Sequence, residues 1–203
     1  MNGRSYICCM KAKTSKAEMT AASLDHVWSN GYHNTSIKDV IERAGILKGS
    51  FYNYFDSKDQ FIGAVLQRYT EGWERMVSGS LKDTSQTPKQ RLRHLFAAYR
   101  EMYQDDMLSK GCLAGNIGQE MGGIHPVLSA QVETSFARVE AMYKSCLDEA
   151  VQEKQISPTT DTGKAASFLI NGLQGVLMRM KTVQTLDPLD DFEEMVFSLL
   201  FER

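Results

Sequence analysis

The sequence lacks almost everything that interrupts an α-helix. It has only 4 prolines in 203 residues, so long stretches can continue a helix without losing a backbone N–H donor. Apolar residues recur at helical spacing, and no alternating β-branched run of strand length is followed by a hairpin turn. The pattern therefore predicts an all-α fold of about nine helices.

Composition narrows the class of protein. With 42% hydrophobic and 24% charged residues, the chain has enough apolar mass for a real core in one or two domains. Its longest apolar runs are far too short to span a membrane, and the N-terminus lacks the apolar core of a signal peptide. We therefore expect a cytoplasmic protein with no membrane partner.

Cysteines and histidines give no metal or disulfide pattern. The four cysteines have no CxxC spacing and fit a reducing compartment: Cys8, Cys9, Cys112 and Cys146. The histidines lie far apart without metal-ligand spacing: His26, His33, His94 and His125. No nucleophile-elbow motif or catalytic constellation is present either. We expect no metal, no cofactor and no enzymatic activity.

The net charge of −2 conceals an asymmetry. Residues 1–58 contain eight Lys or Arg and five Asp or Glu, so this part carries +3 while the remainder carries −5. A small basic module on an acidic body suits a protein that touches a polyanion with one end.

The N-terminal part is divided by glycines into short helices. A first helix is predicted over residues 15–30, and Gly31 ends it. Thr35 or Ser36 then caps a second short helix, with Asp39 at the spacing of a capping box. Gly45 ends that second helix.

A third helix is predicted over "ILKGSFYNYF". Two short helices joined by a tight, glycine-containing turn and packed on a longer one form a helix-turn-helix unit, whose second helix enters the major groove. Lys48, Gly49 and Ser50 lie on the first turn of that helix, while Phe51 and Phe55 form its inward face. A small amphipathic helix that only binds protein through its tyrosines is the competing interpretation.

The segment "GYHNTSIKDVIERAGILKGSFYNYFDSKDQF", residues 31–61, resembles the DNA-binding segment of TetR-family transcriptional regulators. The family pattern is "GY…T(S/T)…DIA…AGVSKGxxYxHFxSKexL". This chain departs from it at Asn53 and Tyr54, which replace a frequent aromatic-histidine pair, and at Leu47, which replaces a small polar residue. The resemblance implies DNA contacts from the matching positions: Ser36, Lys38, Lys48, Gly49, Ser50, Tyr52, Asn53, Tyr54 and Lys58.

The resemblance also implies two domains with different functions. Residues 1–58 would form the DNA-binding domain, and residues 59–203 a helical domain that binds an effector and the partner subunit. Helices are predicted there over 58–80, 88–105, 110–121, 125–154, 160–182 and 188–202.

The last two helices carry broad apolar faces. In the family they pair with their symmetry mates, and a two-fold dimer reads two half-sites of a palindromic operator. The residues expected at the dimer interface are Phe168, Leu169, Gly172, Leu173, Val176, Met180, Leu189, Phe192, Val196 and Leu199. Repression is the common mode of the family, with release by a small-molecule effector.

The effector pocket is expected among the helices of residues 58–182. Aromatic, amide, thiol and methionine side chains at inward-capable positions are its candidate lining: Trp73, Phe96, Tyr99, Tyr103, Cys112, Asn116, Met121 and Asn171. Core packing explains each of them as well.

The stretch "KGCLAGNIGQEMGG", residues 110–123, is rich in glycine but lacks the spacing of a phosphate-binding loop. Its "GCL", at the start of the expected sixth helix, recurs in a subset of the TetR family, some of whose members respond to electrophiles or oxidants through that cysteine. Lys110 and the helix start favour the Cys112 thiolate, whereas burial would make the thiol inert. A thiol-based sensor therefore stands beside the noncovalent pocket as an alternative.

Overall fold

A computed structural model describes residues 15–201 of the chain, and these residues are helical without any strand. The residues outside this range include Cys8, Cys9 and three of the basic residues counted above. The helices are α1 Lys16–Asn30, α2 Ile37–Ala44, α3 Lys48–Tyr52, α4 Lys58–Leu81, α5 Pro88–Met102, the 3₁₀ helix η1 Asp105–Ser109, α6 Leu113–Met121, α7 Pro126–Gln152, α8 Thr162–Val183 and α9 Asp187–Phe201. No helix within residues 15–201 has the length and hydropathy to cross a membrane.

The predicted helices are present, with two corrections between residues 102 and 113. Helix α5 ends at Met102, and the segment expected as a loop contains the 3₁₀ helix η1. Asp105 and Gly111 both have positive φ, of 50° and 64°, which a continuous right-handed α-helix does not include. As a result α6 begins at Leu113 rather than at residue 110.

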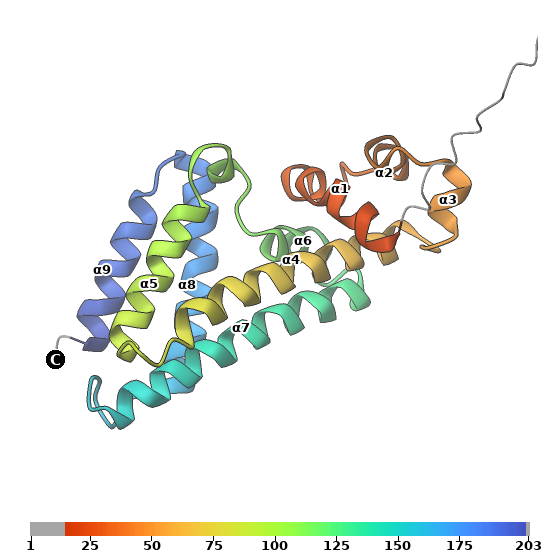
Figure 1. Cartoon of the computed structure of the whole chain (residues 1–203). Coiled ribbons are helices and arrows are strands. Elements are labelled where there is room, and N and C mark those ends of the chain that lie inside the picture. Colours follow the sequence, from red (N-terminus) through yellow and green to blue (C-terminus); the bar gives the residue numbers. More distant parts are fainter. Residues whose placement is uncertain (1–14, 202–203) are drawn as a thin grey trace, which may run out of the picture.

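The molecule is elongated along α4 (Figure 1). Helices α1, α2 and α3 gather at the N-terminal end of α4, and α7 runs beside α4 over much of its length. Helices α5, α8 and α9 form a bundle at the other end, where α8 packs between α7 and α9. Helix α6 lies between the two ends and contacts α1, α4 and α7.

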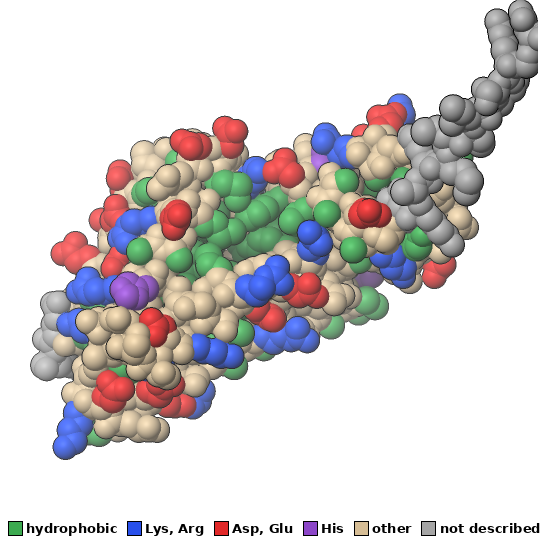
Figure 2. Space-filling model, viewed as in Figure 1, with side chains coloured by type: hydrophobic (Ala, Val, Ile, Leu, Met, Phe, Trp, Pro, Cys, Tyr) green, Lys and Arg blue, Asp and Glu red, His purple; other side chains and the backbone are tan. Residues whose placement is uncertain are grey.

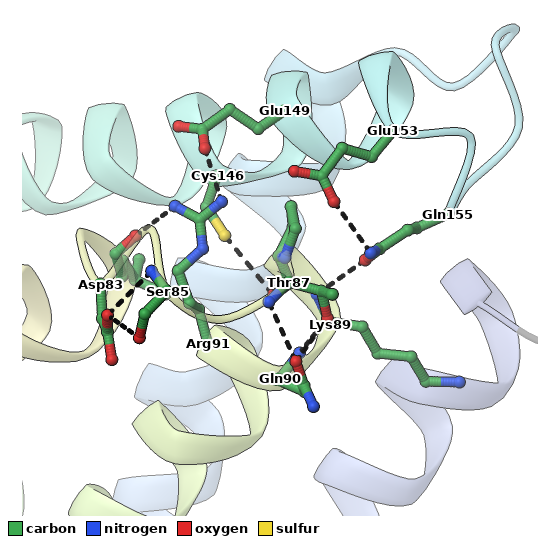
Figure 3. A network of polar contacts seen from close by, with 12 residues as sticks. Asp83, Ser85, Thr87, Lys89, Gln90, Arg91, Cys146, Glu149, Glu153 and Gln155 are labelled. Atoms are coloured by element: carbon green, nitrogen blue, oxygen red, sulfur yellow. Dashed lines mark hydrogen bonds and ion pairs between the residues drawn. The ribbon is translucent and has the colours of Figure 1, made fainter.

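One buried cation fastens the α4–α5 turn to α7 (Figure 3). Arg91 is only 2% exposed, and its guanidinium donates to the Leu81 carbonyl at 2.8 Å and to the Glu149 carboxylate at 2.5 Å. The neighbouring Cys146 thiol contacts the Pro88 carbonyl at 3.7 Å, and burial raises its pKa to about 11. The arginine therefore joins the end of α4, the start of α5 and the C-terminal end of α7.

Replacing Arg91 by alanine should lower the free energy of unfolding by about 2–4 kcal/mol, because a buried cavity replaces the side chain and the Leu81 carbonyl loses its donor. Glu149→Gln should cost less, since the amide oxygen of glutamine can still accept a hydrogen bond from the Arg91 guanidinium at this 39% exposed position. Urea denaturation of the two variants tests this. Equal midpoints for Arg91→Ala and the unmodified chain would contradict the assignment.

Candidate nucleic-acid interface and effector-binding body

Three phenylalanines fix the orientation of α3. Phe51 in α3 and Phe55 just after it are fully buried, with ring centroids 5.5 Å apart. Both rings pack on Phe61 of α4, at 5.7 Å and 5.2 Å. The inward face predicted from the sequence is therefore the observed one, and the opposite face of α3 points to solvent.

The outward face of α3 carries a cation, a bare backbone position and a tyrosine. Lys48, Gly49, Tyr52 and Asn53 are exposed, and a side chain added at Gly49 would meet no atom within 4 Å. The backbone at this position is thus open to close approach by a ligand. Among the other expected DNA contacts, Ser50 and Tyr54 are half-buried.

Ser36 and Lys38 lie at the start of α2. Ser36 forms the predicted capping box: its hydroxyl accepts the Asp39 N–H at 3.2 Å, and Asp39 accepts the Ser36 N–H at 2.8 Å. Lys38 is exposed and lies 3.7 Å from Glu42, one turn later on the same helix. Both positions face solvent, where a phosphate can reach them.

Lys58 is more enclosed than the sequence suggested. Its ammonium lies 4.1 Å from the centre of the Tyr32 ring, and partial burial lowers its pKa. Tyr32 donates a 2.5 Å hydrogen bond to Asp59, which raises the pKa of Tyr32 to about 12. His125, at the start of α7, lies 3.3 Å from the same carboxylate. Lys58 therefore belongs to a cluster that joins the helix-turn-helix to α7.

Glu120 near the end of α6 binds the turn between α1 and α2. Its two carboxylate oxygens accept the backbone N–H groups of Tyr32 at 3.1 Å and His33 at 2.9 Å. Gly31, with φ of 75°, opens this turn, and a side chain there would overlap the Glu120 carboxylate. The glycine is needed both for its backbone angle and for this close approach.

A second link joins α1 to the segment before α6. The Gly111 carbonyl accepts the indole N–H of Trp28 at 2.8 Å and the hydroxyl of Tyr103 at 3.1 Å. Trp28 belongs to α1, and Tyr103 follows the end of α5. Lys110 forms an ion pair with Asp25 of α1 beside this site.

A buried network of aromatic side chains occupies the centre of the helical body. Trp73 donates to the Tyr99 hydroxyl at 2.8 Å, and the Tyr143 hydroxyl lies 3.3 Å from the same oxygen. Burial raises the pKa of Tyr99 and Tyr143, so both remain neutral. Tyr69 stacks edge-on against Trp28 nearby, with ring centroids 4.9 Å apart.

Cys112 is the N-cap of α6 and is 4% exposed. Its sulfur accepts hydrogen bonds from the Tyr69 hydroxyl and the Gly115 N–H, both at 3.4 Å. Burial nevertheless raises the pKa of this thiol above its usual value. The ammonium of Lys110, expected to favour the thiolate, is instead paired with Asp25.

The other expected effector residues divide into buried and exposed groups. Phe96, Tyr103 and Met121 are buried, and Asn116 is half-buried with its amide donating to the Lys110 carbonyl at 2.8 Å. Asn171 was expected to line the pocket, but the structure places it on the exposed face of α8. The helical register turns it away from the side that carries the buried Leu169 and Leu173.

A cleft of about 640 Å³ lies between α4 and α7. Its lining contains none of the residues expected for the effector pocket: Gly63, Leu66, Gln67, Thr70, Pro126, Val127, Ala130, Gln131, Thr134, Ser135 and Arg138. Figure 2 also shows hydrophobic side chains gathered in a hollow between the α1–α3 end and the α5–α8–α9 bundle. Within residues 15–201, no group of His, Cys, Asp and Glu is arranged to hold a metal ion.

The expected dimer residues also divide. Phe168 and Leu199 are exposed, and Gly172 and Phe192 are half-buried against each other. The remaining ones are buried inside their own subunit: Leu169, Leu173, Val176, Met180, Leu189 and Val196. The apolar arcs of α8 and α9 are wide enough to face both inward and outward, and the sequence does not separate the two sides.

The outward side of α8 and α9 is a separate apolar stripe. Its exposed apolar side chains are Phe168 and Met178 on α8 and Met195 and Leu199 on α9, and the exposed Asn171 and Gly175 lie between the two α8 residues at heptad-like spacing. A side chain added at Gly175 would meet nothing within 4 Å, so another helix can approach closely there. Ion pairs of Arg100 with Asp190 and Glu193 fasten α9 to α5 on its other side.

Sequence reasoning missed the residues that join the two ends of the molecule. Glu120 and Trp28 carry no local motif, and their partners are 88 and 83 residues away in the chain. Gly31 is the one local signal for the Glu120 contact. A glycine that ends a helix leaves the backbone N–H groups of the following turn open to a distant acceptor.

Comparison with known proteins identifies both ends of the chain. Residues 20–65 match the family described as bacterial regulatory proteins, tetR family. Residues 88–196 match the family described as tetracyclin repressor-like, C-terminal domain. The first match contains α2 and α3, and the second contains Tyr99 and Tyr143 of the aromatic network and α9 as far as Val196.

Individual relatives agree over most of their length. The chain is 34% identical over 170 residues to the HTH-type transcriptional repressor DhaR of Mycobacterium sp. (strain GP1), covering 84% of each chain. It is 29% identical to the transcriptional regulator AcuR of Cereibacter sphaeroides, covering 89% of this chain and 83% of that one. A crystal structure of a regulatory protein TetR from Rhodobacter sphaeroides superposes with a TM-score of 0.85 and 27% identity, over 91% of this chain and 97% of the other. The chain belongs to the TetR family of DNA-binding, ligand-responsive transcriptional regulators, which are not enzymes.

Proposed function

We propose that this regulator represses transcription in the cytoplasm by binding a palindromic operator as a homodimer, and that a mostly apolar small molecule releases it. The observation that carries the proposal is the outward face of α3, where Lys48, Gly49 and Tyr52 are exposed while Phe51 anchors the inner face. We assign DNA binding to residues 1–58 and effector binding and dimerisation to residues 59–203. The description of the relative DhaR as a repressor supports the direction of control.

Direct DNA contact follows from the geometry of the helix-turn-helix. The first turn of a recognition helix meets base edges, and nearby cations and amides meet phosphates. A regulator acting through protein contacts alone would have no need for a lysine and an open glycine backbone on this turn. That alternative is therefore not favoured.

Lys48→Ala and Tyr52→Ala should each weaken operator binding by about 1–3 kcal/mol, because each removes a contact to a base or a phosphate. Both side chains are exposed, so neither change should unfold the protein. The operator is first defined by selection from random duplexes with the full chain, and affinity is then measured by fluorescence anisotropy at several salt concentrations.

Lys164→Ala is the matched control for that experiment, since this lysine is equally exposed but lies on α8. It should bind the operator like the unmodified chain. Wild-type affinity in both Lys48→Ala and Tyr52→Ala would refute the recognition-helix assignment, and failure to select any duplex would refute DNA binding itself.

The outward stripe of α8 and α9 supports the homodimer. Phe168, Met178, Met195 and Leu199 expose apolar area that a soluble monomer has no reason to gather on one side. Pairing this stripe with its symmetry mate gives a two-fold interface and sets the two recognition helices for half-sites about 34–36 Å apart.

Met178→Glu combined with Leu199→Glu should convert the dimer to a monomer, because carboxylates would be buried without partners at the interface. Both residues are exposed in the subunit, so the helical content should not change. Light scattering after size exclusion gives the mass. Ile124→Glu, at an exposed apolar position between α6 and α7, should remain dimeric, and a dimeric double variant would place the interface elsewhere.

The aromatic network is the proposed contact surface of the effector. Its residues come from α4, α5 and α7. Figure 2 shows an apolar hollow over the middle of the molecule. Trp73, Tyr99 and Tyr143 supply neutral hydrogen-bonding groups within apolar surroundings, as ligand pockets do. A ligand shifts the equilibrium only if it prefers the conformation that cannot bind DNA.

Contacts before α6 and near its C-terminal end connect the helical body to the DNA-binding end. Tyr103 and Trp28 share the Gly111 carbonyl, and Glu120 at the other end of α6 holds the turn at Tyr32. Displacement of α6 by a ligand would therefore move or release α1 and the turn before α2. We propose these contacts as the coupling between effector and operator.

We also propose that "GCL" assigns the chain to the subset of the family with this sequence at the start of α6. In this chain the cysteine serves as the N-cap of α6, and its burial opposes the thiolate. Control by oxidation or alkylation is therefore not favoured over noncovalent binding.

In a chain with Cys8→Ser and Cys9→Ser, Cys112 should react with iodoacetamide at pH 7.5 at least about tenfold more slowly than in urea, since burial restricts access and raises the thiol pKa. A raised pKa depletes the thiolate below it, so the rate should increase as pH rises through and beyond 9. Peptide mapping distinguishes Cys112 from Cys146. Fast alkylation at neutral pH, with operator release that Cys112→Ser abolishes, would instead support Cys112 as a thiol-based sensor.

A further inference from the structure

The most exposed large hydrophobic side chain within residues 15–201 lies beside the recognition helix. Leu47 is 80% exposed and directly precedes α3. Single exposed leucines are ordinary on protein surfaces, so exposure alone assigns no role. Its position between α2 and the exposed pair Lys48 and Gly49 places it on the surface that meets DNA.

Leu47 also occupies a position where a polar residue would stabilise the helix. In each of the other α-helices from α1 to α8, the side chain of the N-cap residue accepts a hydrogen bond from a backbone N–H. Ser36 does so for α2 and Ser57 for α4. Helix α3 alone has no such bond, because leucine has no acceptor. The helix that reads DNA thus has a bare apolar side chain in place of a cap.

The backbone of Leu47 is held in an extended conformation just before α3. Leu47 is extended, with φ −81° and ψ 151°, and its carbonyl accepts the Ser50 N–H at 2.9 Å. Gly49 two residues on has no side chain and no neighbour within 4 Å of its missing Cβ. The surface around Leu47 therefore leaves room for a base edge to approach.

We propose that Leu47 is a specificity residue that packs against the 5-methyl group of one thymine in each operator half-site. In the major groove, the 5-methyl group of thymine is the largest apolar group on a base edge, and most other readable groups are hydrogen-bond donors or acceptors. A leucine, which has no hydrogen-bonding group, therefore pairs best with that methyl group. The inference rests on the proposed operator binding and adds a base preference to it.

The test removes the methyl group and the leucine separately and together. Each thymine of the selected operator is replaced in turn by uracil, which keeps the base pair and deletes only the methyl group, and affinity is measured for the unmodified chain and for Leu47→Ala. At one symmetric pair of positions, uracil should weaken the unmodified chain by roughly fourfold for each half-site, the effect of exposing one methyl group. Leu47→Ala should bind the thymine and uracil operators equally.

Two variants separate this readout from folding and from general affinity. Leu47→Ser can cap α3, so it should raise the melting temperature while losing the preference for thymine. Lys48→Ala should bind all operators more weakly but keep the thymine preference. The proposal is overturned if no thymine shows coupling to Leu47, or if the selected half-sites contain no thymine. If the unmodified chain selects no duplex at all, the proposed function fails together with this inference.

Discussion

The packing of Phe51 on Phe55 and Phe61 is the contact on which the DNA-binding surface depends. Helix α3 has five residues, too few for its internal hydrogen bonds to hold it in water. Burial of Phe51 supplies the stability that the helix lacks, and it also fixes which side faces outward. Since Phe61 belongs to α4, this packing attaches the recognition helix to a helix of 24 residues that extends into the effector-binding body.

The two ends of the molecule are joined by more than the continuity of α4. The Gly111 carbonyl binds Trp28, and the Glu120 carboxylate binds the backbone of Tyr32 and His33, so both ends of α6 are attached to the α1–α2 region. If α6 were displaced, these contacts would have to move with it or break. Because Tyr103 shares the Gly111 carbonyl, a change at the end of α5 alters the same contact that orients α1.

The sequence predicted the features that short-range rules determine. The Ser36 capping box, the stop at Gly31 and the inward Phe51 all follow from residues within one or two turns, and the structure confirms them. The contacts of Glu120 depend on residues 87 and 88 positions away, which no local pattern indicates. Leu169 and the neighbouring Phe168 look alike in the sequence, yet packing against other helices buries the first and exposes the second. For the same reason the sequence does not show that Asn171 lies on the exposed side of α8.

The aromatic network restricts the chemistry of a molecule that could enter it. Trp73, Tyr99 and Tyr143 satisfy one another, so a ligand that separates them must replace their hydrogen bonds or leave buried polar groups unpaired. Burial raises the pKa of these tyrosines, which keeps them neutral donors and acceptors throughout the physiological pH range. A charged ligand would find no opposite charge among these three side chains and would lose its hydration. We infer that an effector bound here is uncharged and largely apolar, with hydrogen-bonding groups that replace the bonds donated by Trp73 and Tyr143.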